Sequence, residues 1–313
     1  MMFEIRPVPL DSVTFSSSWN LHPCELYTLP RELVSSFARV GILHPPILLT
    51  KEAGRFEIVC GFKRLLFAAS ILERREVDCL ILAANTEPEA ILDIILTDQF
   101  LARSLSIVEK ARFLEICTRF LQPQQIADSY CDRLMLDRRQ STLQKLLDIL
   151  SEPHESLTAF HSGTLQEKVV MELLDLPSED DRNSLVKFFK RLQMGEGKQR
   201  RLLSLIRDLA FYDDRPIAAF LEDSSIQEIL NDRNMNNPQK VQHLNSFLQQ
   251  KLNPLFSNAE RDFADKVKSL KIPENCTISH SPSFEKDEVT LSITFENLAA
   301  CQEWLPTLKH GLA

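Results

Sequence analysis

A glycine turn beside two cations is the part of the sequence best suited to chemistry. Residues 54–69 read GRFEIVCGFKRLLFAA, in which a short alternating strand runs into Gly61 and an amphipathic helix follows at once. The first turn of such a helix offers unpaired backbone N–H groups and the positive end of its dipole, and Lys63 and Arg64 add charge there. This combination is suited to holding phosphate. The same residues also fit an ordinary strand-to-helix turn with two solvated cations.

The segments on either side of this turn extend the pattern. Upstream, residues 29–50 read LPRELVSSFARVGILHPPILLT; downstream, residues 97–116 read TDQFLARSLSIVEKARFLEI. Together they resemble the N-terminal domain of the ParB chromosome and plasmid partition proteins, in which a helix and a strand lead to a GERRxxAA turn and then to an ENLQRxxLxPIEEA segment. The positions that fall on this pattern are Gly41, Pro45, Gly61, Arg64, Ala68, Ala69, Arg103, Leu105, Ile107, Glu109 and Ala111.

The resemblance continues beyond that domain. Residues 147–174 are similar to the family's segment after its helix-turn-helix, and residues 259–309 have its C-terminal order of helix, strand, strand and helix. In the family this last part is a dimerisation module. The resemblance therefore implies a homodimer, with DNA and a ParA-type ATPase as partners.

A nucleotide site is also implied by the resemblance, because ParB proteins bind CTP and Mg²⁺ at the GERR turn and the ENxxR segment. Carried over position by position, the cofactor-binding residues are Gly61, Lys63, Arg64, Asp98, Gln99 and Arg103, with Asp98 as the metal ligand. This chain departs from the family where Phe62 replaces an acidic residue and Lys63 replaces an arginine. A lysine cannot form the bidentate fork of arginine. The sequence is thus compatible with CTP binding, with at most a weak CTPase activity, and with the loss of both.

A degenerate helix-turn-helix is expected in residues 122–150. Gln125 to Tyr130 would form its first helix and Ser141 to Leu150 its second, joined by a turn that lacks glycine and is longer than the family's. Residue types that contact phosphates and base edges gather at the start of the second helix. The DNA-binding candidates here are Arg138, Arg139, Gln140, Ser141, Thr142 and Lys145. Three nearby aspartates partly cancel their charge, and a helical hairpin with a solvated polar face explains the segment equally well.

A second candidate for DNA contact is a basic segment at residues 187–207. It carries Lys187, Lys190, Arg191, Lys198, Arg200, Arg201 and Arg207 against a single acid, Glu196, and we expect Lys198, Arg200 and Arg201 to meet DNA. The chain as a whole carries a net charge of −8, so any electrostatic attraction to phosphates must come from such a local face. Two solvated amphipathic helices joined by a GEG turn are the alternative interpretation.

Two enzyme classes are alternatives to a binding protein. Sulfiredoxin shares the N-terminal fold and uses a cysteine in a GCHR turn, whereas here Cys60 precedes the glycine and lies on an apolar strand phase. A nuclease needs clustered metal-binding carboxylates. The sequence offers Asp98 and Glu109, and Glu109 is more simply explained as a helix cap. We therefore expect neither a thiol enzyme nor a nuclease.

The fold class expected is α+β, with a small mixed-sheet N-terminal domain (1–104), a helical domain with the degenerate helix-turn-helix (105–252) and an αββα dimerisation module (255–313). Strands are expected at Val8–Phe15, Ile47–Thr50, Phe56–Cys60 and Val77–Leu82, and helices at Glu87–Phe100 and, behind a Ser106–Glu109 capping box, to about Leu121. Linkers are expected at Asn231–Pro238 and as a turn near Asn253–Asn258.

The composition also indicates where in the cell the protein acts. The longest apolar runs fall below the roughly 20 residues that span a bilayer, and the seven scattered cysteines include no Cys-x-x-Cys pair. We therefore expect a cytoplasmic, nucleoid-associated protein that acts in DNA partitioning or nucleoid organisation. The alternative is a dimeric protein-interaction adaptor that has lost nucleotide switching.

Overall fold

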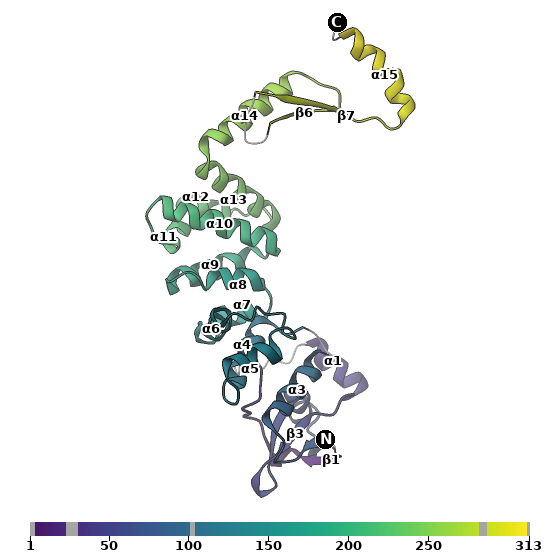
Figure 1. Cartoon of the computed structure of the whole chain (residues 1–313), viewed down its shortest axis with the longest axis vertical. Coiled ribbons are helices and arrows are strands. Elements are labelled where there is room, and N and C mark those ends of the chain that lie inside the picture. Colours follow the sequence, from purple (N-terminus) through teal and green to yellow (C-terminus); the bar gives the residue numbers. More distant parts are fainter. Residues whose placement is uncertain (1–3, 23–30, 101–103, 282–286, 312–313) are drawn as a thin grey trace. The chain divides into compact units, whose positions relative to one another are not determined.

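A mixed five-stranded sheet forms the start of the chain. The computed structural model describes residues 4–22, 31–100, 104–281 and 287–311 (Figure 1). The strands lie in the order β1-β5-β3-β4-β2, in which β1 is antiparallel to β5 and β3 antiparallel to β4, while β5 is parallel to β3 and β4 to β2. Their bounds are β1 Glu4–Pro9, β2 Val13–Thr14, β3 Ile47–Thr50, β4 Phe56–Cys60 and β5 Glu76–Leu82.

The first strand differs from the expectation of one element over Val8–Phe15. The chain instead makes β1, a 3₁₀ turn over Leu10–Ser12, and the short β2, which pairs with β4 at the opposite edge of the sheet. Proline at position 9 has no N–H with which to continue a ladder. The turn therefore carries the chain from one edge to the other.

Helices cover this sheet and supply much of its core. Three of them belong to this region: α1 Arg31–Val40, α2 Phe62–Ser70 and α3 Pro88–Phe100. Leu65 and Ala68 of α2 are fully buried with Leu48 of β3 and Ile58 of β4. The apolar, β-branched composition of β3 and β4 suits a strand that is buried on both faces.

A helical region follows, as expected, and its first helix begins at the predicted capping box. The Ser106 side chain accepts from the backbone N–H of Glu109, and the Glu109 side chain accepts from the N–H of Ser106. This helix ends at Cys117, earlier than the predicted Leu121. The helices are α4 Ile107–Cys117, α5 Pro123–Tyr130, α6 Gln140–Asp148, α7 His154–His161, α8 Glu167–Leu173, α9 Glu179–Leu192, α10 Glu196–Tyr212, α11 Ile217–Leu221, α12 Ser224–Asn231 and α13 Asn237–Leu252.

The last part of the described chain has the expected order of helix, strand, strand and helix. Its elements are α14 Pro254–Ser269, β6 Cys276–His280, β7 Val289–Ile293 and α15 Leu298–Gly311, and β6 and β7 are antiparallel. The loop between α12 and α13 matches the first predicted linker. The second differs: only Asn253 separates α13 from α14, because Pro254 is well suited to the first position of a helix.

Residue contacts divide the chain into two compact units, 1–199 and 200–313. The expected α+β class is confirmed, with a mixed sheet, a helical middle and a small C-terminal sheet. The division into three domains stays a prediction. None of the helices in the described residues combines the length and the apolar character that crossing a bilayer requires.

An irregular segment, residues 17–22, crosses from the sheet to α4, and we call it the strap. At its start, Glu57 of β4 accepts from the N–H (2.8 Å) and the hydroxyl (2.6 Å) of Ser18. Further along, Trp19 stacks on Phe120 with ring centroids 5.3 Å apart, and Arg112 of α4 donates to the carbonyl oxygen of Asn20. The strap therefore joins parts of the chain that lie far apart in the sequence.

Candidate functional site

The turn between β4 and α2 requires glycine. Gly61 has φ +88°, in the left-handed region, and is the N-cap of α2. A Cβ at this position would lie 3.0 Å from Cα and Cβ of Pro46 and 3.0 Å from Nε of Arg64. The close approach of two backbone segments, and not only the turn, therefore depends on the missing side chain.

Arg64 uses its guanidinium to hold this region together. Its Nη1 donates to the carbonyl oxygens of His44 (2.8 Å) and Pro45 (3.1 Å), and its Nη2 donates to Asp98 at 2.9 and 3.2 Å. The side chains of Arg64 and Asp98 are only 17% and 20% exposed. Two residues predicted to hold phosphate and magnesium are thus paired with each other. We call this arrangement the Arg64 clamp.

The other predicted cofactor residues are distributed around the same turn. Lys63 lies half-buried in the first turn of α2, and Gln99 lies half-buried near the end of α3. Phe62, which replaces the family's acidic residue, is buried and meets Phe15 edge-on at 6.0 Å, so it serves the core. Arg103 lies outside the described residues.

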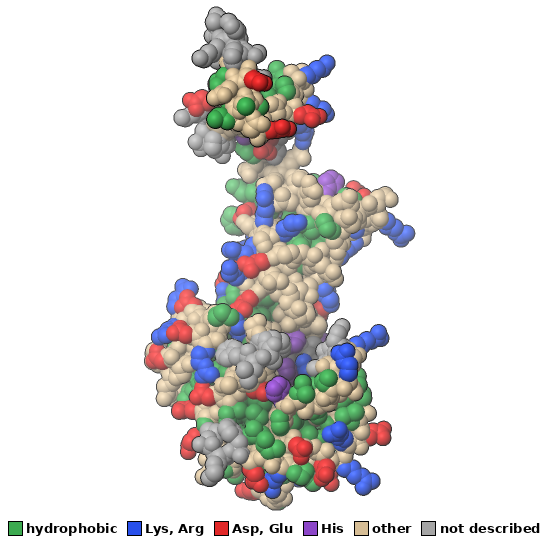
Figure 2. Space-filling view, turned by 90° about the vertical axis from the view of Figure 1, so that its right-hand side faces the viewer, with side chains coloured by type: hydrophobic (Ala, Val, Ile, Leu, Met, Phe, Trp, Pro, Cys, Tyr) green, Lys and Arg blue, Asp and Glu red, His purple; other side chains and the backbone are tan. Residues whose placement is uncertain are grey.

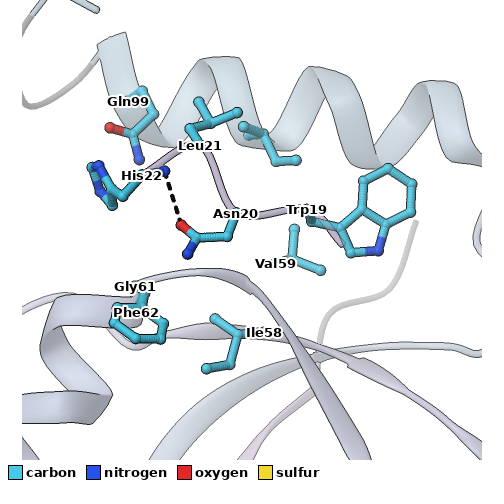
Figure 3. Close-up of a pocket in the computed structure, with 10 residues that line it drawn as sticks. Trp19, Asn20, Leu21, His22, Ile58, Val59, Gly61, Phe62 and Gln99 are labelled. Atoms are coloured by element: carbon cyan, nitrogen blue, oxygen red, sulfur yellow. Dashed lines mark hydrogen bonds between the residues drawn. The ribbon is translucent and has the colours of Figure 1, made fainter. Parts of the chain in front are cut away.

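The cavity at the turn is small because the strap lies in it. Figure 3 shows Asn20, Leu21 and His22 between the Gly61 turn and the helix that carries Gln99. The cavity these residues line has a volume of about 20 Å³, enough for a single water molecule. Pockets that bury a ligand of nucleotide size measure about 300–1,000 Å³. This cavity is too small to hold a triphosphate.

Cys60 precedes the glycine and is 4% exposed. Burial, followed by the charge of Asp98, raises the pKa of its thiol well above the usual value. A thiol held in its protonated form is a poor nucleophile. The position fits a core residue, as the strand phase predicts.

The expected helix-turn-helix corresponds to α5, the connection 131–139 and α6. Helix α6 packs against α4 and buries Leu143 and Leu146, which leaves its first turn at the surface. The long connection is turned by Met135, a non-glycine residue at φ +56°. Gln140 and Ser141 are exposed there, and Thr142 is half-buried.

The predicted DNA-contacting cations in this region are paired with aspartates. Arg138 donates from Nε to Asp132 at 3.1 Å, and Arg139 donates from Nε to Asp137 at 2.5 Å. Nζ of Lys145 lies 2.5 Å from Oδ1 of Asp175. The hydrogen bond from Arg138 holds the pKa of Asp132 below its usual value.

The basic segment lies on α9 and α10. Gln193, in the left-handed region, ends α9, and two residues of the predicted GEG turn, Glu196 and Gly197, belong to α10 instead. Lys198, Arg200 and Arg201 are exposed near the start of α10. Figure 2 shows Lys and Arg interspersed with Asp and Glu on the face in view.

Substitution of Gly61 should test the close approach at the turn. We expect Gly61→Ala to lower the free energy of unfolding by about 2–4 kcal/mol, because the left-handed backbone and the contact with Pro46 both add strain. Gly41→Ala is the matched control, since Gly41 has φ +75° with open space around it, and it should lose about 1–2 kcal/mol. Urea unfolding measures both, and equal losses would contradict the role of crowding.

Calorimetric titration should separate a structural clamp from a nucleotide site. We expect CTP with Mg²⁺ to give no saturable heat with the wild-type chain. Asp98→Asn removes the ionised partner of Arg64, so this variant should bind inorganic phosphate more tightly than wild type. Asp93→Asn, on the same helix, is the control. Saturable CTP binding that Asp98→Asn abolishes would instead identify Asp98 as a magnesium ligand.

Among known proteins, the chain is similar to solved structures. No protein-family model and no curated protein matches the chain. It is similar to the C-terminally truncated chromosome-partitioning protein ParB from Caulobacter crescentus complexed with CTP-γ-S, at 18% identity over 59% of this chain and 98% of that one, with a TM-score of 0.24. The same protein complexed to the centromeric parS site gives 17% identity over 62% and 96%, with a TM-score of 0.35.

A third similar structure is a Pnob8-like ParB-N domain, at 14% identity over 85% of this chain and 98% of that one, with a TM-score of 0.40. All three names agree with the resemblance predicted from the sequence. With TM-scores of 0.40 and below, the likeness assigns no ligand and no partner to this chain.

Proposed function

We propose that this chain is a ParB-like DNA-binding protein that acts in DNA partitioning or nucleoid organisation. The observation that carries the proposal is the exposed first turn of α6, which is fixed on α4 by the buried Leu143 and Leu146. A recognition helix of a helix-turn-helix is held in this way, with its N-terminal residues directed at the major groove.

The residues at that turn have chemistry suited to DNA. Gln140 and Ser141 are exposed and can hydrogen-bond base edges or phosphate oxygens. The backbone N–H groups of the first turn add a positive end to the helix dipole. In this arrangement α6 supplies readout and α4 supplies rigidity.

The aspartate pairing of the nearby arginines is compatible with this role. The side chains of Arg138 and Arg139 are 53% and 75% exposed. Exposed ion pairs contribute about 0–1 kcal/mol each, so a phosphate can replace an aspartate at little cost. The pairs then act as a weak barrier to non-specific binding.

Phosphate contacts along the backbone are assigned to α10. Lys198 and Arg201 are one helical turn apart on one face of α10, and Arg200 and Arg207 are two turns apart on another face. These exposed cations supply the sequence-independent attraction that a chain of net charge −8 must obtain from a local surface.

We further propose that DNA binding by this chain needs no nucleotide. The Arg64 clamp and the cavity of about 20 Å³ support a structural role for the Gly61 turn. The CTP- and Mg²⁺-dependent version of the function is the one that the calorimetric titration tests.

A homodimer through residues 255–313 remains part of the proposal. Val289 and Leu291 of β7 are 63% and 52% exposed, and Leu298 of α15 is 74% exposed. A module of this size with apolar side chains at its surface can bury them against a second copy. A ParA-type ATPase stays the partner that the sequence resemblance implies.

The adaptor is the second candidate function. The aspartate partners of Arg138 and Arg139 and the acidic balance of the chain favour it. An adaptor would keep the dimer and the Arg64 clamp and would bind no DNA, even at low salt.

Ser141→Glu should weaken DNA binding without weakening the fold. An acid in the first turn of α6 is favourable for the helix dipole but repels phosphate. We expect at least a tenfold loss of affinity for duplex DNA by fluorescence anisotropy. The control is Ser225→Glu, the same substitution at the same position of α12, which should bind as wild type. Equal affinities of the two variants would remove α6 from the interface.

The salt dependence of DNA binding should report the α10 contacts. Neutralising two phosphate-contacting cations lowers the slope of log K against log salt by about 1.8. We expect this change for Arg200→Ala with Arg201→Ala, and no change for Arg74→Ala with Arg75→Ala, an adjacent exposed pair near the sheet. Absence of DNA binding by the wild-type chain at low salt would leave the adaptor as the function.

A further inference from the structure

We propose that His22, Glu109 and His161 form a binding site for a transition metal ion of the zinc class. One ligand atom from each of the three lies within 4.8 Å of those of the other two. The residues come from three elements, namely the strap, α4 and α7. Two imidazoles with one carboxylate are a ligand set that suits Zn²⁺ and is unlike the all-oxygen sets of Mg²⁺ and Ca²⁺.

The three ligand atoms lie within 4.8 Å of one another, and one pair is already near the separation found in a tetrahedral site. Nδ1 of His22 lies 3.0 Å from Oε1 of Glu109. The ring centroids of His22 and His161 are 6.3 Å apart, with an angle of 79° between the ring planes. Ligand atoms about 2.0–2.1 Å from a tetrahedral zinc ion are separated from each other by about 3.3 Å. Small side-chain movements therefore bring the three ligand atoms to metal-binding distances.

Ser106 orients two of the three ligands. Its backbone N–H donates to Oε2 of Glu109 at 2.9 Å, which leaves Oε1 on the side of His22. Its hydroxyl lies 2.9 Å from Nδ1 of His161. Metal ligands are commonly held by such second contacts, which fix ring orientation and ligand basicity. The capping box of α4 is thus also a support for the site.

Burial explains why a cation is suited to this place. Glu109 is completely buried, and the side chain of His22 is 13% exposed. A buried carboxylate needs a close positive charge, and a divalent ion supplies more of it than a hydrogen-bonded imidazole. Three protein ligands leave the fourth position of a tetrahedral zinc ion to a water molecule.

The consequence of the site is a fixed strap. His22 is at the end of the described strap, so a metal ion would tie this end to α4 and α7. The strap would then be fastened at both ends, by Glu57 at its start and by the metal at its finish. The site is separate from the proposed DNA contacts and does not depend on them.

Zinc titration of the full chain without an affinity tag tests the proposal. After removal of metals with a chelator, we expect calorimetry with Zn²⁺ to give one site per chain and to raise the thermal unfolding midpoint. Co²⁺ should give the visible absorption bands of a tetrahedral complex with nitrogen and oxygen ligands. His161→Ala should lose at least tenfold in Zn²⁺ affinity together with the Co²⁺ bands, and His22→Ala should do the same.

The control is His154→Ala, which removes an exposed histidine from the same helix as His161 and should bind Zn²⁺ as wild type does. Zinc affinity of His161→Ala and His22→Ala equal to wild type would place the metal on other residues and overturn the site. A wild-type chain without stoichiometric zinc would also overturn it and leave His22 and Glu109 as a pair in direct contact. Circular dichroism of each variant keeps misfolding apart from ligand loss.

Discussion

The N-terminal fold depends on how the charge of Arg64 is satisfied. A guanidinium that is 17% exposed must find partners inside the protein, and it finds an aspartate on α3 and two carbonyl oxygens before β3. Gly61 makes this possible, because a Cβ there would meet Nε of Arg64 at 3.0 Å. The same guanidinium cannot also neutralise a phosphate without giving up contacts that join three elements. Structure and ligand binding therefore compete for one side chain.

Two buried carboxylates, Glu57 and Glu109, contact the strap and hold it in place. Burial by itself would raise the pKa of Glu57, but hydrogen bonds from Lys51 and Ser18 outweigh it and hold that pKa below its usual value. A lowered pKa means that this pairing stabilises the fold at neutral pH and that its contribution fades as the pH falls through the pKa of Glu57. Glu109, at the other end, faces His22. The strap is held by charges that the sheet and α4 supply.

The cations on the helical surface differ from Arg64 in their exposure to solvent. Arg138 and Arg139 have aspartate partners as Arg64 does, yet their side chains are mostly in water, where such pairs are weak. They can exchange an aspartate for a phosphate, whereas Arg64 is bound to the fold. Solvent exposure, more than residue type or pairing, thus separates cations available to a polyanionic partner from those that build the protein.

The sequence by itself determined β3, β4, the glycine turn and the capping box of α4, because periodicity and capping depend on neighbours within a few residues. It also indicated the long connection before α6. Only the tertiary structure decided that β1 and β2 lie on opposite sheet edges, that Asp98 forms a salt bridge with Arg64, and that His22 and His161 meet at Glu109. These pairings join segments far apart in the chain, and nothing in the local sequence of either partner specifies the other.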